Sequence, residues 1–349
     1  MSFYAVYLRP RCALSRPIGS DTLFGAMCWA VRELWGTSKL EDLLKREPPP
    51  FAFSSAFPCL WGGNGPVRFY PRPATLELTV ESMERLSRGD KKRKVELTKF
   101  VKMLKVPYFS EEVFSKAISG ELDAEGIVAG LEDRSLVGVG EALLTRKEAV
   151  GVDPRGRYRA FWRTADVQRN QVDRMMGGTA EGMLFFSEGT AFSEFAGLWF
   201  LVSTDEPGLV EAGLRYLEDT GFGGERSVGW GHYEVKFVEE RFRVPEAEEP
   251  DSWVNLSRYI PKEGECDFCS EPLAYELLVV RPKNEAKVPA GGYRLYKGVM
   301  RVFAPGSVFP LGEAKLVYGR LVPSGSSGGW KIFHSGLAIP AFSRFGGEG

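Results

Sequence analysis

The chain has 349 residues, of which 44% are hydrophobic and 13% aromatic, so it can fill more than one ordinary core and lies far from the composition of disordered proteins. Its formal net charge of −1 argues against a free-standing nucleic-acid binder that relies on bulk positive charge. No apolar run approaches the roughly 18 residues of a membrane span, and the five scattered cysteines are not a disulfide framework. These features predict a cytoplasmic protein without membrane contact.

The N-terminal segments predict a strand followed by an amphipathic helix. Phe3–Leu8 is rich in aromatic and aliphatic residues, as expected of a buried strand. Ser20 is placed to cap a helix in which apolar residues recur at the i, i+3, i+4 spacing of one helical face, from Leu23 to Leu34. Gly36 then predicts the end of this helix.

A polar segment interrupts the first domain. Residues 81–145 are mostly helical in pattern and much more polar than their surroundings, so we interpret them as an insertion. After it come two strand-like runs, a second amphipathic helix and a half-buried strand, at Met183–Phe186, Leu198–Ser203, Leu209–Leu217 and His232–Val238. Strand, helix, strands, helix, strand is the β-α-β-β-α-β order of a ferredoxin-like domain, which we assign to residues 1–244.

A second domain is predicted over residues 252–349. The acidic, proline-bearing stretch Pro245–Asp251 is the expected linker. Beyond it the chain has strand-like runs at Tyr275–Arg281, Gly298–Phe303, Ala314–Leu321 and Gly336–Phe342. The predicted fold class is therefore α+β.

Residues 221–231 form a glycine-rich loop that is predicted to run from a helix into a strand. Its glycines are Gly221, Gly223, Gly224, Gly229 and Gly231. Glycine lets a backbone approach a ligand closely, and its amides can point at phosphate oxygens. A dinucleotide motif fails because Arg226 replaces its third glycine, and a P-loop fails because Trp230 replaces its lysine. We predict a phosphate-cradling loop that also carries Ser227; the alternative is a turn that serves chain geometry only.

Two other segments concentrate positive charge. In Arg155–Arg163 the residues Arg157, Arg159 and Arg163 alternate with other side chains, which predicts an extended hairpin that tracks RNA. The alternative there is a solvated surface ribbon. Residues 85–105 hold nine Lys and Arg against two acidic residues, and this run is either solvated or in contact with nucleic acid or an acidic neighbour.

At the glycine-rich loop the sequence resembles the RAMP proteins of CRISPR systems, and further segments narrow the resemblance to the guide-end subunit of type III-A (Csm) effector complexes. Ser20–Leu34 is similar to the first helix of that subunit, and His334–Phe342 is similar to its last segment. Asn170–Arg174 with Gly182–Glu188 is similar to a stretch shared by type III RAMP subunits. These matches span nearly the whole chain, and their order makes the combination specific.

The resemblance implies two ferredoxin-like (RRM-like, RAMP) domains and membership of a ribonucleoprotein of antiviral defence. It implies a grip on the 5′ handle of the guide RNA (crRNA). It also implies contacts with the large polymerase-like subunit and the adjacent backbone subunit, with target RNA as a further contact. Besides the loop and the arginines above, the residues expected along the RNA path are Arg16, Ser20, Arg169, Asn170, Arg174 and His232.

The resemblance also predicts that the chain is not an enzyme. In cutting relatives, an aspartate in the loop before the first helix supports cleavage of target RNA, whereas Arg9–Gly19 contains no Asp or Glu. Asp21 lies in the first turn of the helix, where a carboxylate favourably meets the helix dipole. The alternative is a metal-independent endoribonuclease that processes guide precursors, with His232 as its key group.

We predict no cofactor and no metal. Cys266 and Cys269 form a lone C-x-x-C, and a structural zinc needs four ligands. With His334 as one remote ligand the set is too small to close a site.

Overall fold

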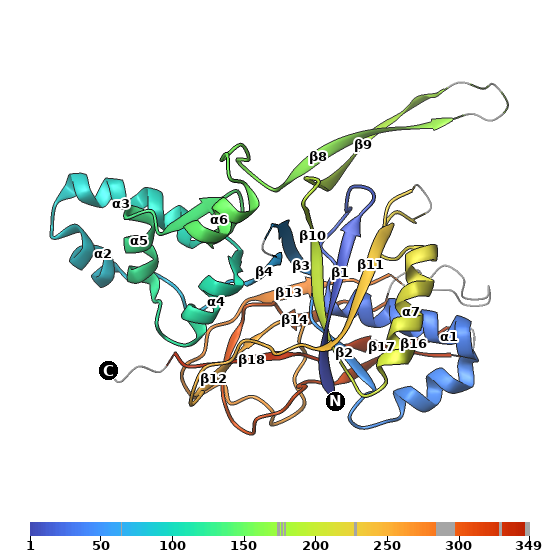
Figure 1. The fold of residues 1–349 in the computed structure, drawn as a ribbon. Helices are drawn as coiled ribbons and strands as arrows, with labels where there is room; N and C mark the ends of the chain where they lie inside the picture. The colour runs from blue at the N-terminus through green and yellow to red at the C-terminus, as the bar shows by residue number, and fades with distance from the viewer. Residues whose placement is uncertain are drawn as a thin grey trace.

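Figure 1 shows the computed structural model of the chain, which describes residues 1–345 except for 64, 173–174, 176, 178, 227–228, 284–296 and 328–329. Helices and strands are mixed within it, so the predicted α+β class is confirmed. No helix of these residues is long and apolar enough to cross a membrane.

The described residues are organised around a mixed sheet. Its strand order is β11-β1-β10-β3-β4-β5-β7-β6, and β2 also pairs with β10. The pairs are antiparallel except for β5 with β7. The strands are β1 (Ser2–Pro10), β2 (Phe51–Phe53), β3 (Phe57–Gly62), β4 (Gly65–Pro71), β5 (Tyr108–Ser110), β6 (Leu136–Val139), β7 (Ala142–Thr145), β10 (Ala196–Thr204) and β11 (Tyr233–Arg241).

Two helices cover one face of this sheet. They are α1 (Ser20–Leu44) and α7 (Pro207–Thr220), and they pack against each other beside β1 and β11 (Figure 1). Met27 of α1 and Leu214 of α7 are buried in one core with Val6 of β1, because the apolar stripe of each helix faces the sheet. The elements β1, α1, β10, α7 and β11 occur in the predicted order. The run Met183–Phe186, predicted as a further strand of this domain, instead belongs to β9 (Thr179–Phe192), which pairs with β8 (Trp162–Val172) outside the main sheet.

The start and the middle of α1 differ from the prediction. Gly19, not Ser20, is the N-cap residue, and Ser20 is the first helical residue. Gly36 has φ +87° and breaks the helix as expected, but a second helical segment continues directly to Leu44.

The C-terminal residues cover the opposite face of the sheet. The strands β12 (Ser252–Asn255), β15 (Val308–Pro310) and β18 (Pro340–Ser343) form a small sheet. Its Val254 and Ala341 share a buried core with Trp199 and Leu201 of β10. The predicted linker packs against β18, since Ala247 is buried and its N–H donates to the Phe342 carbonyl at 2.9 Å.

The second predicted domain contains two further ribbons. They pair β13 (Leu277–Val280) with β14 (Met300–Phe303) and β16 (Leu321–Ser327) with β17 (Trp330–Ser335). The described part of residues 252–345 has strands and no helix. The ferredoxin-like form of this domain therefore stays a prediction.

The segment predicted as an insertion is largely helical. It contains α2 (Val80–Ser87), α3 (Lys91–Leu104), α4 (Glu111–Ile118) and α5 (Ala124–Glu132), and α6 (Arg146–Val152) follows directly after its predicted end. Figure 1 shows α2, α3 and α5 grouped at one end of the molecule. Its strands β5, β6 and β7 extend the main sheet, so the insertion is attached by hydrogen bonding and not only by its two chain connections.

An antiparallel hairpin projects from the body (Figure 1). It consists of β8 (Trp162–Val172) and β9 (Thr179–Phe192), and we call it the arm. The predicted extended ribbon at 155–163 is only partly right, because the described residues form a turn and loop up to Phe161 and β8 begins at Trp162.

Candidate nucleic-acid interface

The glycine-rich loop connects α7 to β11. Gly221 ends α7, with its N–H donating to the Leu217 carbonyl at 2.8 Å. The loop is closed at its neck, where the Phe222 N–H donates to the Gly231 carbonyl at 3.0 Å. The Phe222 ring is buried against Tyr233 at a centroid distance of 4.7 Å. The loop is thus anchored at both ends to the sheet that carries it.

Chain geometry explains the glycines at the neck. Gly221 and Gly231 have φ of +72° and +77°, in the left-handed region that favours glycine. A Cβ on Gly231 would lie 2.5 Å from the Phe222 carbonyl oxygen, and one on Gly221 would lie 2.9 Å from the Gly231 carbonyl oxygen. These two positions need glycine with or without a ligand.

Gly223 and Gly224 differ from the neck glycines, because their backbone N–H groups have no acceptor among the described residues. Gly223 has φ +90°, and the nearest atom to a Cβ placed there is the Tyr233 hydroxyl at 3.8 Å. The N–H groups of Gly223, Gly224 and Glu225 donate to no other residue that the structure describes. Glu225 also has positive φ, at +62°. Consecutive amides around left-handed residues form the concavities that bind anions in other proteins.

The loop between β1 and α1 lies beside the glycine-rich loop. The Arg11 N–H donates to the His232 carbonyl at 3.0 Å, and the Cys12 thiol lies 3.8 Å from the same oxygen. A Cβ on Gly224 would lie 2.6 Å from the Ser15 hydroxyl. Arg16 follows in this loop and is exposed, so the structure brings this predicted contact next to the glycines.

The root of the arm is fixed to the same place by Trp230. The Arg169 guanidinium lies over the Trp230 ring at 4.4 Å from its centroid, and it pairs with Glu225 at 3.8 Å. A Cβ on Gly189 would lie 2.6 Å from the Trp230 ring, so the β9 backbone presses directly on the indole. Trp230 is only 6% exposed. It therefore positions the arm rather than offering a free stacking surface for a base.

The remaining predicted contacts lie in different environments. Asn170 and Arg163 are exposed on the arm, and Arg157 and Arg159 are exposed in the loop before it. Arg226 and His232 are half-buried in and just after the glycine-rich loop. Arg174 and Ser227 lie outside the described residues. Three parts of the chain that are far apart in sequence thus meet at this site: the loop between β1 and α1, Arg169 and Gly189 of the arm, and the glycine-rich loop.

Ser20 is the exception, because it is buried. Its hydroxyl accepts the Arg258 N–H at 2.8 Å, and an RNA contact would require that hydrogen bond to open. Beside it, Asp21 accepts from the Arg258 guanidinium at 3.0 and 3.3 Å, with a side chain 4% exposed. Asp21 lies in the first turn of α1, as predicted. Its pair with Arg258, which was not predicted, also joins the start of α1 to the C-terminal residues.

His334 completes this buried cluster without forming an ion pair. Its Nε2 lies 4.0 Å from an Asp21 oxygen and has no hydrogen-bond partner in the described part of the chain. Burial lowers the pKa of His334 to about 4; the nearby Lys297 and Arg258 charges also lower it, and Asp21 opposes them. Burial likewise lowers the pKa of Lys297, whose ammonium donates to the Phe333 carbonyl at 2.7 Å. His334 is therefore neutral near pH 7.

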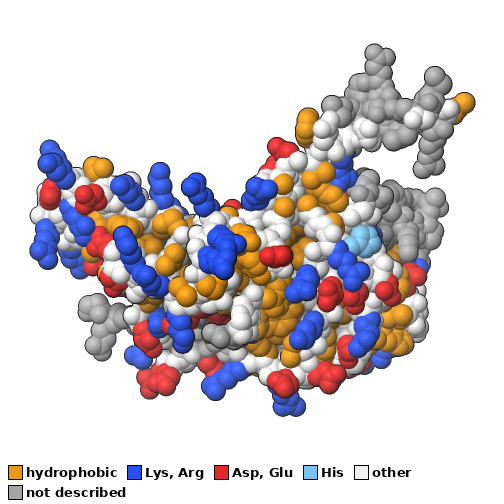
Figure 2. All heavy atoms as spheres, turned by 45° about the horizontal axis from the view of Figure 1, so that its top comes forward, with side chains coloured by type: hydrophobic (Ala, Val, Ile, Leu, Met, Phe, Trp, Pro, Cys, Tyr) orange, Lys and Arg blue, Asp and Glu red, His pale blue; other side chains and the backbone are white. Residues whose placement is uncertain are grey.

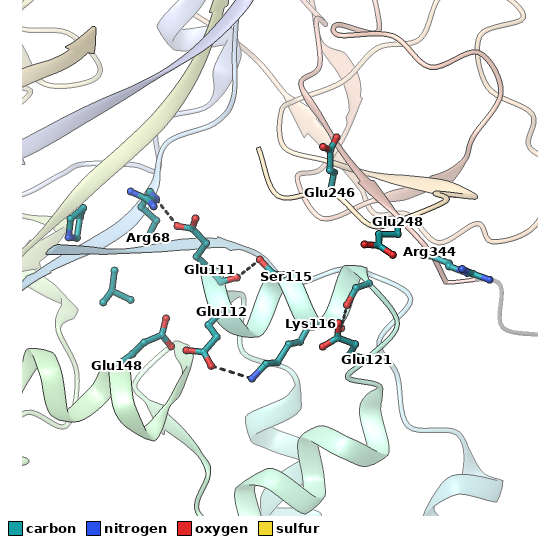
Figure 3. A pocket seen from close by; sticks show the side chains of 13 residues that line it. Arg68, Glu111, Glu112, Ser115, Lys116, Glu121, Glu148, Glu246, Glu248 and Arg344 are labelled. Atoms are coloured by element: carbon teal, nitrogen blue, oxygen red, sulfur yellow. Dashed lines mark hydrogen bonds and ion pairs between the residues drawn. The ribbon is translucent and has the colours of Figure 1, made fainter. Parts of the chain in front are cut away.

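A large open pocket elsewhere in the described residues is acidic and does not suit phosphate. Figure 3 shows it between α4 and the C-terminal segment, with a volume of about 770 Å³. All three of its cations are already paired, Arg68 with Glu111 at 2.6 Å, Lys116 with Glu112 at 3.1 Å and Arg344 with Glu249 at 3.5 Å. Its glutamates outnumber the cations, and they are Glu111, Glu112, Glu121, Glu148, Glu246 and Glu248. An RNA backbone would be repelled here.

No metal site is formed by the described residues, since no three His, Cys, Asp or Glu side chains are grouped to hold an ion. Cys266 lies 3.1 Å from the Tyr259 hydroxyl, and Cys269 is exposed.

Sequence reasoning missed the contacts that link the arm to the glycine-rich loop. Gly189 lies in a strand pattern, where an isolated glycine often marks a close backbone approach, and this was the available signal. The pairing of Arg169 with Trp230 joins residues 61 positions apart, and no local pattern in either segment reports it.

The fold and this site define an α+β protein in which a glycine-rich loop leads from α7 into β11 of the main sheet and is exposed at Gly224 and Glu225. No protein-family model matches the chain. A curated relative is 27% identical over 262 residues, covering 74% of this chain and 75% of its own length; it is the CRISPR system Cms protein Csm4 of Thermococcus onnurineus (strain NA1).

Solved structures of Csm4-containing complexes have the same fold. A chain of the Csm3–Csm4 subcomplex in the type III-A CRISPR-Cas interference complex is 16% identical, with a TM-score of 0.64 over 99% of this chain and all of its own. A chain of the Csm1–Csm4 cassette in complex with cA4 is 20% identical, with a TM-score of 0.59 over the same shares. The predicted recognition is confirmed: the chain is a homologue of Csm4.

Proposed function

We propose that the chain is a non-catalytic RNA-binding subunit of a type III-A CRISPR interference complex. It holds the 5′ handle of the crRNA and bridges the large polymerase-like subunit to the backbone subunit. The names of the solved relatives support the two protein partners, since one structure pairs Csm4 with Csm1 and another pairs it with Csm3.

The observation that carries the RNA part of this proposal is the row of amides at Gly223, Gly224 and Glu225, which have no acceptor among the described residues. Gly223 is half-buried, and Gly224 and Glu225 are exposed, so a ligand can reach this row of amides. A phosphate oxygen can accept hydrogen bonds from several such donors at once. Arg16 is exposed and directly follows Ser15, whose hydroxyl would lie 2.6 Å from a Cβ on Gly224. Such contacts hold a backbone in register without reading bases.

The second candidate function is a metal-independent endoribonuclease that uses His232. It is favoured by one observation: His232 directly follows the glycine-rich loop, and a Cβ on Gly221 would lie 3.4 Å from its ring. A phosphate held by the loop would therefore be close to an imidazole. Replacing His232 with Ala distinguishes the candidates, because cleavage would vanish in the enzyme whereas binding would persist in the RNA-holding subunit.

The test of the proposal compares two substitutions at one position. Gly223→Asp and Gly223→Asn have nearly the same volume, both residues tolerate positive φ better than other types, and the site has room for a side chain. They differ in charge. We would measure binding of labelled crRNA to the full chain, co-assembled with its neighbouring subunits, across a salt series and examine the RNA for cleavage.

We expect Gly223→Asp to weaken binding at least tenfold more than Gly223→Asn, because a carboxylate repels the phosphate while the amide does not. The RNA should stay intact in every sample. Equal binding by the two variants would refute the phosphate cradle. Cleavage that is lost in His232→Ala would replace the proposal by the endoribonuclease.

A further inference from the structure

The positive charge of residues 85–105 is gathered on one face of α3. The lysines Lys91, Lys92, Lys94, Lys99, Lys102 and Lys105 are all exposed. At 100° per residue they fall within an arc of about 160°. We call this surface the lysine face. The opposite side of α3 buries Leu97 and Leu104 against its neighbours α2 and α5.

No acidic side chain balances the lysine face. Among the described residues, none of its six lysines forms an ion pair. Arg93, by contrast, points away from it and pairs with Glu132 at 2.6 Å and with Glu96 at 3.7 Å. Figure 2 shows Lys and Arg side chains gathered over the helical end of the molecule, on the same view that shows the arm.

This arrangement is unfavourable for α3 itself. Lys91 and Lys92 lie in the first turn, which contains no acidic residue, although the positive end of a helix dipole favours carboxylates there. Only the Asp90 cap offsets this, by accepting the Lys92 N–H at 2.9 Å. Lys99, Lys102 and Lys105 also repeat at the i, i+3 spacing, where like charges repel. Such unfavourable placement of like charges is expected at a binding surface, where a ligand of opposite charge compensates for it.

We propose that the lysine face binds the phosphodiester backbone of single-stranded RNA, as a second contact beyond the glycine-rich loop. Lysine ammonium groups are point charges that suit a backbone and not a base edge. The face is about 21 Å long at 1.5 Å per residue, enough for several consecutive phosphates. This inference rests on the proposed function, and two sources share the chemistry: the crRNA beyond its handle and the target RNA.

The experiment neutralises three lysines that point directly outward, with the changes Lys91→Gln, Lys99→Gln and Lys102→Gln. Glutamine is a good helix former, so α3 should persist. The matched control is Lys39→Gln, Lys45→Gln and Lys262→Gln, because each of these lysines is already paired with a carboxylate. We would measure two salt-dependent binding series. In the first, crRNA binds to the full chain; in the second, target RNA binds to the crRNA-loaded complex.

Losing three phosphate contacts should reduce the slope of log affinity against log salt by about 2 and weaken binding at least tenfold at moderate salt. The control should match the native chain. The binding series that shows the change, with crRNA or with target RNA, identifies the RNA strand.

Unchanged slopes in both arms would overturn the inference. If Gly223→Asp still weakens crRNA binding in the same series, the proposed function survives this failure; if it does not, both fail. Unchanged RNA slopes together with loss of a protein subunit from the complex would assign the lysine face to an acidic protein partner instead, which also overturns the inference.

Discussion

At the scale of single residues, Trp230 connects two features that are separate in the sequence. Its indole is covered by Arg169 on one side and pressed by the Gly189 backbone on another. Cation–π contacts and ring packing of this kind hold a partly desolvated guanidinium in place. Trp230 therefore helps to set the direction of the arm relative to the glycine-rich loop, together with the hydrogen bonds between the Leu14 and Thr190 backbones at 2.9 and 2.8 Å.

Replacing Trp230 with Ala should release the arm. Removing a buried Trp costs about 3–5 kcal/mol where the site cannot collapse, and here the loss falls on the root of the arm. We expect faster amide exchange at residues 165–170 and 187–191, measured by hydrogen–deuterium exchange. Trp35→Ala is the control, because that ring is 43% exposed on α1. Unchanged protection in Trp230→Ala would contradict the positioning role.

The neck of the glycine-rich loop gives a second residue-scale prediction. Gly231→Ala forces a Cβ to within 2.5 Å of a carbonyl oxygen at a residue with φ +77°. We expect a loss of about 1–3 kcal/mol in unfolding free energy and weaker RNA binding. Gly208→Ala is the control, since a Cβ there meets no atom within 4 Å and α7 gains a better helix former. Equal stability of the two variants would show that the neck is not strained.

His334 makes stability depend on pH. Its pKa is about 4 in the folded chain and about 6.5 when exposed, so the unfolded chain binds the proton more readily between these values. This contribution is complete above about pH 6.5 and is lost as the pH falls toward 4, by about 3 kcal/mol in total. His334→Gln should show a flatter dependence of the unfolding free energy on pH between pH 4 and 6.5, measured by chemical unfolding. A native slope in His334→Gln would contradict the assignment.

At the scale of elements, the amphipathic segments were the predictable ones. The strand at the N-terminus and the helices α1 and α7 follow from periodic apolar residues, because each buries one face against the sheet. The exact start of α1 was missed by one residue, since Ser20 is held by Arg258, 238 positions away. The hairpin was predicted to begin too early in the chain, because the alternating pattern of Arg155–Arg163 resembles that of a strand. Tyr158 is instead held in a turn, where its N–H donates to the Asp153 carboxylate at 2.9 Å.

The charge pattern of α3 predicts a gain in stability when it is reversed at the start of the helix. Lys91→Glu with Lys92→Glu places carboxylates at the positive end of the helix dipole, which should stabilise the chain by about 1 kcal/mol. Lys102→Glu with Lys105→Glu, at the other end, should give no such gain. Thermal unfolding at low salt measures both. A lower melting temperature for the first variant would show that the first-turn lysines are not a local liability.

At the scale of the whole molecule, the two predicted domains share a core, and this was not visible in the sequence. Residues 245–251 have the composition of a linker, yet Ala247 is buried and hydrogen-bonded to Phe342. Burial of Val254 and Ala341 against Trp199 and Leu201 ties the C-terminal strands to the first sheet. Composition reports solvent preference along the chain, whereas this packing depends on contacts between residues far apart in sequence.

Different surfaces of the molecule carry opposite charge. The acidic pocket of Figure 3 lies between α4 and the C-terminal segment, whereas the arm, the glycine-rich loop and the lysine face offer amides and cations. A chain of net charge −1 can in this way bind RNA on selected surfaces and leave others for protein partners.

The most direct test of the central claim is photo-crosslinking from the 5′ end of the crRNA in the assembled complex. A photoreactive nucleotide within the 5′ handle should crosslink to this chain, and the crosslinked peptides should come from residues 221–232 or 11–16. Crosslinks from the handle to another subunit alone, or to the acidic pocket of this chain, would contradict the account.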